Sequence, residues 1–75
     1  MVERTFMKTV SITTPYITLG QFLKFCGLIG NGSEARFFLE ENSCLVNGEE
    51  EKRRGKKLYP KDIVTINGEE YKVEG

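Results

Sequence analysis

Histidine is absent from this 75-residue sequence, which removes the commonest general base and the commonest metal ligand in proteins. Cys26 would be the obvious nucleophile, but it has no histidine to activate it. Asp62 lies in a predicted turn and has no second carboxylate to suggest a paired acid-base site. We therefore expect a chain that is not an enzyme and that uses no metal, other cofactor or small-molecule substrate.

Long apolar runs are also absent, and the longest candidate, Phe25–Ile29, is far short of the roughly 20 residues that cross a bilayer. The N-terminal residues lack the continuous apolar stretch of a signal peptide. We expect a cytoplasmic protein with no membrane partner. In that compartment Cys26 and Cys44, which have no CxxC partner, are expected to be buried thiols rather than a disulfide.

Net charge is lacking as well, because eleven basic and eleven acidic residues cancel. A basic isoelectric point, the usual sign of nucleic-acid binding, is therefore missing, and only the distribution of charge can reveal such a surface. Seventy-five residues hold one compact core. We expect a flexible tail over residues 1–9 and a single, monomeric domain over residues 10–75, in which Val10 and Ile12 alternate as a short strand.

The clearest helix signals begin at Thr18, which forms a capping box with Gln21. Apolar residues then fall at i, i+3, i+4 and i+7, on one face of a helix, and Gly27 offers a stop. These apolar residues are Leu19, Phe22, Leu23 and Cys26. Lys24 lies off this face and is expected to point to solvent.

A second helix is predicted after the turn at Gly30–Ser33, with Ser33 as its cap and Glu34 as its first residue. Its buried face would consist of Ala35, Phe38 and Leu39. A connection this short makes the two helices neighbours in a hairpin. The polar residues on or near its turn form a first candidate surface, which consists of Lys24, Asn31, Ser33 and Arg36.

From Cys44 onward, short β segments are separated by Asn47-Gly48 and Asn67-Gly68, dipeptides typical of two-residue hairpin turns. Such a turn at Asn67-Gly68 places Val64 across from Tyr71. Helices and strands are segregated along the chain. We therefore predict an α+β fold in which a two-helix hairpin packs on a small antiparallel sheet.

The stretch Glu49–Lys57 departs most from a random surface, because three acids precede five bases in it. These bases are Lys52, Arg53, Arg54, Lys56 and Lys57. Five like charges repel one another, so their clustering is easier to understand if a polyanion neutralises them. The competing interpretation is a solvated loop whose bases are partly offset by the adjacent glutamates. This basic run and the helical hairpin flank the same predicted strand, Cys44–Val46, so we expect them to share a face that contacts about four to six phosphates.

Two further interpretations concern single residues. Asn31 and Ser33, at a helix N-terminus, can bind a phosphate or a 2′-hydroxyl. Tyr59 beside the basic run can stack on an unpaired base, but a core position together with Leu58 is the favoured interpretation.

Four segments, Thr18–Lys24, Gly32–Arg36, Leu45–Gly48 and Leu58–Val64, stand in a definite order and spacing. Together they resemble the alpha-L RNA-binding domain of the ribosomal S-four type, and in particular its short bacterial branch, which is associated with ribosomes. The resemblance implies that the two helices and the following β loop bind structured RNA, with roles for Lys24, Ser33, Arg36 and Lys52–Lys57. Family members commonly have Arg-Leu-Asp where this chain has Thr18-Leu19-Gly20, and an arginine where it has Gly32.

We therefore expect a non-catalytic protein that docks on structured RNA, ribosomal RNA in particular, in ribosome assembly or function. The alternative is a small protein-interaction or ubiquitin-like carrier domain, which the size, the sheet and the terminal Gly75 suggest. Such carriers end in Gly-Gly, whereas this chain ends in Glu74-Gly75.

Overall fold

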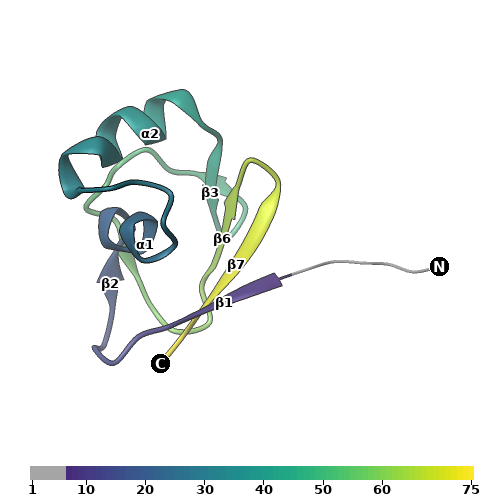
Figure 1. Cartoon of the computed structure of the whole chain (residues 1–75). Helices are drawn as coiled ribbons and strands as arrows, with labels where there is room; N and C mark the ends of the chain where they lie inside the picture. The colour runs from purple at the N-terminus through teal and green to yellow at the C-terminus, as the bar shows by residue number, and fades with distance from the viewer. Residues whose placement is uncertain (1–6) are drawn as a thin grey trace.

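The computed structural model describes residues 7–75, which contain two α-helices, one 3₁₀ helix and seven strands (Figure 1). In chain order these elements are β1 (Met7–Ser11), β2 (Ile17–Thr18), α1 (Leu19–Phe25), the 3₁₀ helix η1 (Gly32–Glu34), α2 (Ala35–Glu41), β3 (Cys44–Val46), β4 (Glu49–Glu50), β5 (Lys57–Leu58), β6 (Ile63–Ile66) and β7 (Glu69–Glu74). Neither α-helix of residues 7–75 has the length and apolar character needed to span a membrane. The class is α+β, as predicted.

The larger sheet is mixed rather than antiparallel, which differs from the prediction. Its strand order is β1-β7-β6-β3-β4, and only β1 runs parallel to its neighbour, from Met7 beside Glu70 to Ser11 beside Glu74. Strands joined by a tight turn must be antiparallel, but β1 and β7 are separated by both helices, and this long crossover permits a parallel pair. β1 also includes residues 7–9 of the predicted tail, and residues 1–6 of that tail lie outside the described residues.

Both Asn-Gly dipeptides form the predicted two-residue turns. The φ angles are 54° and 87° at Asn47 and Gly48, and 49° and 90° at Asn67 and Gly68, so both central residues are left-handed as in a type I′ turn. The turn between β6 and β7 sets the register, and Val64 lies opposite Tyr71 as predicted. Both side chains are buried.

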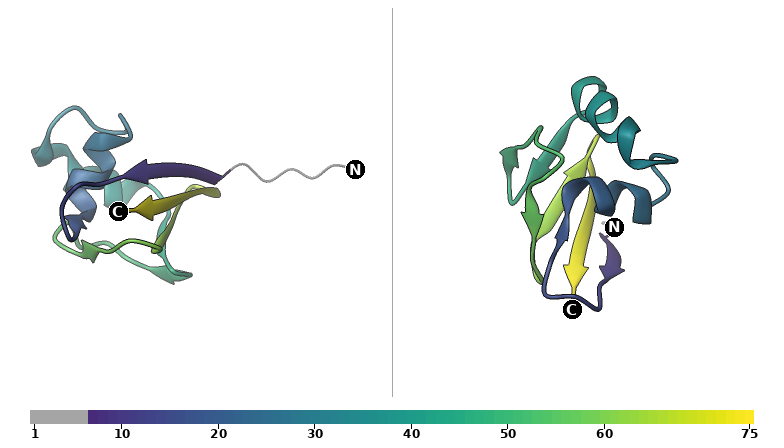
Figure 2. Two further views of the ribbon diagram at one scale, coloured as in Figure 1. Left: turned by 90° about the horizontal axis from the view of Figure 1, so that it is seen from below. Right: turned by 90° about the vertical axis from the view of Figure 1, so that its left-hand side faces the viewer.

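Helix α1 packs its apolar face on the sheet, and Figures 1 and 2 show it next to α2 on one side of the strands. Leu19, Phe22 and Leu23 are fully buried, and the Phe22 ring meets the Tyr71 ring edge-on with centroids 5.5 Å apart. The helix ends where predicted, because Gly27 has a φ of 76°, a left-handed conformation with which an α-helix cannot continue. From α2, Ala35 and Leu39 complete the core, with Phe38 half-buried against it.

Candidate nucleic-acid interface

The segment Lys52–Lys57, called the basic loop below, is attached to the N-terminus of α1 by its backbone. The N–H groups of Leu19 and Gly20 donate to the carbonyls of Lys56 and Arg54 at 2.8 and 2.9 Å. The first N–H groups of a helix have no partner within the helix, so these two bonds satisfy donors that would otherwise need water or a side chain. The basic loop is therefore held against the helix at two points.

Two further contacts strengthen this attachment. The third amide of α1, that of Gln21, donates to the Thr18 hydroxyl at 3.2 Å, and the Gln21 side chain accepts the Thr18 N–H at 2.9 Å, which is the predicted capping box. The residues that precede the helix pair with those at the end of the loop as the two-stranded sheet β2–β5, with Thr18 opposite Lys57. Helix start and loop end therefore form one rigid unit.

The basic loop and the helical hairpin line one open groove of about 320 Å³. Lys24 of α1, Gly32 of the helical turn and Arg54 of the loop all contribute to its wall. The loop and α1 approach each other at Gly20, where an added Cβ would lie 3.5 Å from the Arg54 carbonyl oxygen, at ordinary van der Waals distance. The hairpin turn and the middle of the basic loop thus meet on one face. Lys24 is exposed there, as predicted.

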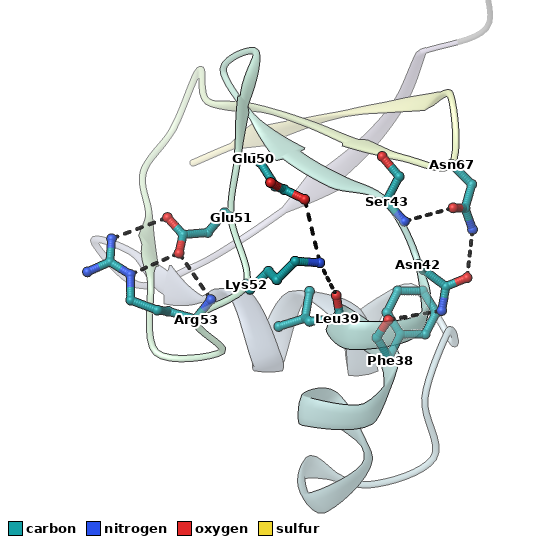
Figure 3. A network of polar contacts seen from close by, with 9 residues as sticks. All are labelled: Phe38, Leu39, Asn42, Ser43, Glu50, Glu51, Lys52, Arg53 and Asn67. Atoms are coloured by element: carbon teal, nitrogen blue, oxygen red, sulfur yellow. Dashed lines mark hydrogen bonds and ion pairs between the residues drawn. The ribbon is translucent and has the colours of Figure 1, made fainter.

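Two of the five bases in the loop are engaged in ion pairs that shape the loop itself (Figure 3). Arg53 donates to both oxygens of the Glu51 carboxylate, from Nε at 2.9 Å and from Nη2 at 3.3 Å. Lys52 donates to the Leu39 carbonyl at 3.0 Å, near the C-terminus of α2, and lies 3.5 Å from a Glu50 oxygen. A lysine at this end of a helix supplies a partner to an otherwise unsatisfied carbonyl.

Glu51 is held strongly in its charged form. The hydrogen bonds from the Arg53 side chain, and after them the Arg53 backbone bond and charge, outweigh partial burial and lower the pKa of Glu51 to about 2. The carboxylate is therefore ionised throughout the neutral range, and Arg53 has a permanent internal partner.

The remaining bases of the candidate face differ in how far they are engaged. The Nε of Arg36 lies 3.8 Å from a carboxylate oxygen of Glu40 on the exposed side of α2. This ion pair is long and exposed and therefore weak, so another anion can displace Glu40. Lys57 places its ammonium 5.0 Å from the centre of the Tyr16 ring. Within residues 7–75, four bases of this face have no carboxylate partner, and they are Lys24, Arg54, Lys56 and Lys57.

The prediction that Ser33 caps the second helix is wrong, because the N-cap residue of α2 is Glu34, which makes no side-chain cap hydrogen bond, and a 3₁₀ helix with its own cap precedes it. Asn31, not Ser33, caps the turn, because its Oδ1 accepts the Ser33 N–H at 3.1 Å and the Ser33 hydroxyl as well. Asn31 is extended and can reach the amide two residues on, whereas Ser33 is already inside η1. Glu34 is likewise in η1, and its carboxylate accepts the Gly30 N–H at 2.8 Å. α2 begins only at Ala35.

Tyr59 is not the core anchor that the sequence favoured. Leu58 is fully buried, but Tyr59 is 48% exposed, because successive residues of β5 and its continuation point to opposite sides. The Tyr59 ring centroid lies 5.7 Å from that of Tyr16, a residue that no sequence pattern had marked as functional. The two-residue period around Leu58 was the signal that could have placed Tyr59 on the surface.

Both cysteines are free thiols rather than a disulfide, as predicted, but only Cys44 is buried as expected, and neither thiol is activated. Burial, with a smaller contribution from Glu51, raises the pKa of Cys44 to about 11, and burial also raises the pKa of the half-buried Cys26. A thiol in its protonated form is a poor nucleophile.

The fold, with its two neighbouring helices and the basic loop attached to them, is typical of a small nucleic-acid-binding domain. Comparison with known proteins identifies the family. The model of the S4 domain matches residues 10–74, so the chain belongs to the S4 domain family. Among curated proteins it is similar to "Probable ribosome maturation protein RlbA" of Bacillus subtilis (strain 168), with 52% identity over 59 residues that cover 79% of this chain and 83% of that protein.

Proposed function

We propose that this protein is a non-catalytic RNA-binding protein whose single domain, residues 10–75, docks on structured RNA and acts in ribosome maturation. The observation that carries the proposal is the groove where Lys24 of α1 and Arg54 of the basic loop come together. The similarity to a probable ribosome maturation protein of Bacillus subtilis supports ribosomal RNA as the ligand.

The bases divide into two groups in this proposal. Those without a carboxylate partner bind phosphates, and they are Lys24, Arg54, Lys56 and Lys57. Arg36 can add a contact, because its pair with Glu40 is long and exposed. Lys52 and Arg53 hold the loop in shape through their internal partners, and Asn31 and Ser33 fix the hairpin turn.

Recognition of this kind depends on the shape of the RNA. Cations at fixed positions on the α1–loop unit match a particular spacing of phosphates, but they read no bases. The backbone hydrogen bonds between α1 and the loop keep that spacing constant. The protein would therefore prefer an irregular or folded RNA that presents phosphates at the right distances.

The test is the salt dependence of binding to helical RNA fragments, ribosomal ones included. Four phosphate contacts predict a slope of log K against log salt of about −3, and each lost contact makes it shallower by about 0.7 to 0.9. Arg54→Ala and Lys56→Ala should each remove one contact. Lys72→Ala is the matched control, because Lys72 already pairs with Glu74 at 3.7 Å. A variant lacking all four unpaired bases that keeps the original slope would contradict the proposal.

A further inference from the structure

Two exposed aromatic rings lie beside the basic loop and a third shares a groove with one of them, and the binding of phosphates does not account for them. Tyr16, Phe25 and Tyr59 are 38%, 66% and 48% exposed. Large rings that remain in water lose the free energy that burial would provide, so a cluster of them on a small domain indicates a contact surface.

The two tyrosines form a fixed pair. Ile17 pairs with Leu58 across β2 and β5, so the adjacent residues Tyr16 and Tyr59 are brought side by side, with ring centroids 5.7 Å apart and planes at 45°. The backbone of Tyr59 is anchored by Asp62, whose carboxylate accepts the Tyr59 N–H at 2.8 Å. The rings are therefore held in place before any ligand arrives, and ordering them costs little on binding.

The aromatic surface continues into the surface proposed to bind phosphates. Tyr16 and Phe25 line an open groove of about 610 Å³, and Thr18 and Gln21 form part of this groove and of the Lys24–Arg54 groove. Tyr59 lines a third groove of about 490 Å³, whose other walls come from the basic loop. A single strand of nucleic acid could pass from one groove to the next without leaving the protein.

Charge identifies the occupant. The described residues that line these three grooves include no aspartate or glutamate, whereas five bases line the second and third: Lys24, Arg54, Arg53, Lys56 and Lys57. The ammonium of Lys57 lies 5.0 Å from the centre of the Tyr16 ring, so a cation adjoins the aromatic surface itself. Single-stranded nucleic acids bind where aromatic rings stack on their bases and cations contact the phosphates of their backbone.

We propose that Tyr16 and Tyr59 form a stacking site for an unpaired nucleotide that adjoins the helical part of the RNA. The base lies against a tyrosine ring, and its phosphate contacts Lys56 or Lys57. This inference rests on the proposed function and narrows its ligand class to RNA in which a helix adjoins an unpaired segment.

The experiment compares two RNAs that share one duplex, where the first is blunt and the second carries a short unpaired extension with 2-aminopurine as the reporter base. The wild-type protein should bind the extended RNA at least about five-fold more tightly than the blunt one and should quench the reporter. Tyr59→Ala should lose most of this difference, and Tyr59→Phe should keep it. Phe37→Ala is the control, because Phe37 is 68% exposed on α2 and lines none of the three grooves.

The outcomes separate this inference from the proposed function. Equal binding of both RNAs, with no quenching and no effect of Tyr59→Ala, would overturn the stacking site while leaving duplex binding intact, and would point to a protein partner for the rings. Failure to bind either RNA would overturn the proposed function. Circular dichroism of each variant checks the fold, which should persist because both tyrosines are partly exposed and Leu58 remains the buried anchor.

Discussion

Replacing Glu51 by glutamine should weaken the fold and strengthen RNA binding at the same time. In the wild-type protein the Glu51 carboxylate accepts the Arg53 side chain at 2.9 and 3.3 Å and the Arg53 backbone N–H at 3.0 Å. Glutamine has nearly the same size but no charge, so the ion pair is lost while the packing is kept. The Arg53 side chain is 78% exposed, so the released guanidinium can reach a phosphate without any rearrangement of the fold.

The two effects have different sizes. Solvent screens the pair, so the free energy of unfolding at neutral pH should fall by only about 0.5–1 kcal/mol. One added phosphate contact should make the slope of log K against log salt steeper by about 0.7 to 0.9. A four-fold rise in salt, from 50 to 200 mM, would then reduce the affinity advantage of the variant over the wild type about three-fold.

Urea unfolding measures the first effect, and RNA binding across a salt series measures the second. Glu49→Gln is the matched control, because it changes the net charge equally while Glu49 has no ion pair among residues 7–75. It should raise affinity slightly without changing the slope. If Glu51→Gln leaves the slope at the wild-type value, Arg53 does not bind a phosphate even when it is released from Glu51. The proposal that ion pairing separates the structural bases from the phosphate-binding bases is then refuted.

Three further predictions concern acid stability, the core and the helical turn. The pKa of Glu51 is lowered from 4.5 to about 2, so the stabilisation that its carboxylate provides is present above about pH 4.5 and is lost as the pH falls toward 2. In urea unfolding, the free energy of unfolding of Glu51→Gln should therefore fall less over this pH range than that of the wild-type protein. Phe22→Ala should cost about 3–5 kcal/mol in urea unfolding, because the ring is fully buried against Tyr71, and a cost below 1 kcal/mol would contradict the packing. Gly32→Arg should make the salt slope of RNA binding steeper by about 0.7 to 0.9, because Gly32 lines the Lys24–Arg54 groove and has open space around it, whereas the same change at the exposed Ser43 should not.

Features encoded by neighbouring residues were predictable from the sequence. The capping box of Thr18 and Gln21 needs only a spacing of three residues, and it starts α1 where expected. Each Asn-Gly turn requires two residues that tolerate a positive φ. The turn at Asn67-Gly68 then fixes the register that places Val64 opposite Tyr71. Such signals are local, so no knowledge of the tertiary fold is needed to interpret them.

Features that depend on distant parts of the chain were not predictable. The direction of β1 is set by pairing with β7 at the other end of the chain, and the attachment of the loop to α1 joins Gly20 to Arg54 by a backbone bond that no side-chain pattern encodes. Asn31 and Ser33 are both good capping residues, and only the backbone conformation distinguishes them. The exposure of Tyr59 is a different case, because the two-residue period of a strand places it on the face opposite the buried Leu58 and could have predicted it.

The acidic and basic halves of Glu49–Lys57 have to be understood together, because the structure pairs two of the five bases with neighbouring glutamates and leaves the other three without a carboxylate partner among residues 7–75. Glu50 and Glu51 do offset neighbouring bases, as the solvated-loop interpretation required, but they engage Lys52 and Arg53 at the start of the loop. These pairs fix the loop where it leaves the sheet, and the bonds from α1 fix it further on. The bases beyond them, Arg54, Lys56 and Lys57, are therefore held in place without being neutralised. A chain of zero net charge can thus present a local cationic face, because Glu50 and Glu51 pair with Lys52 and Arg53 and leave the later bases of the loop unpaired among residues 7–75.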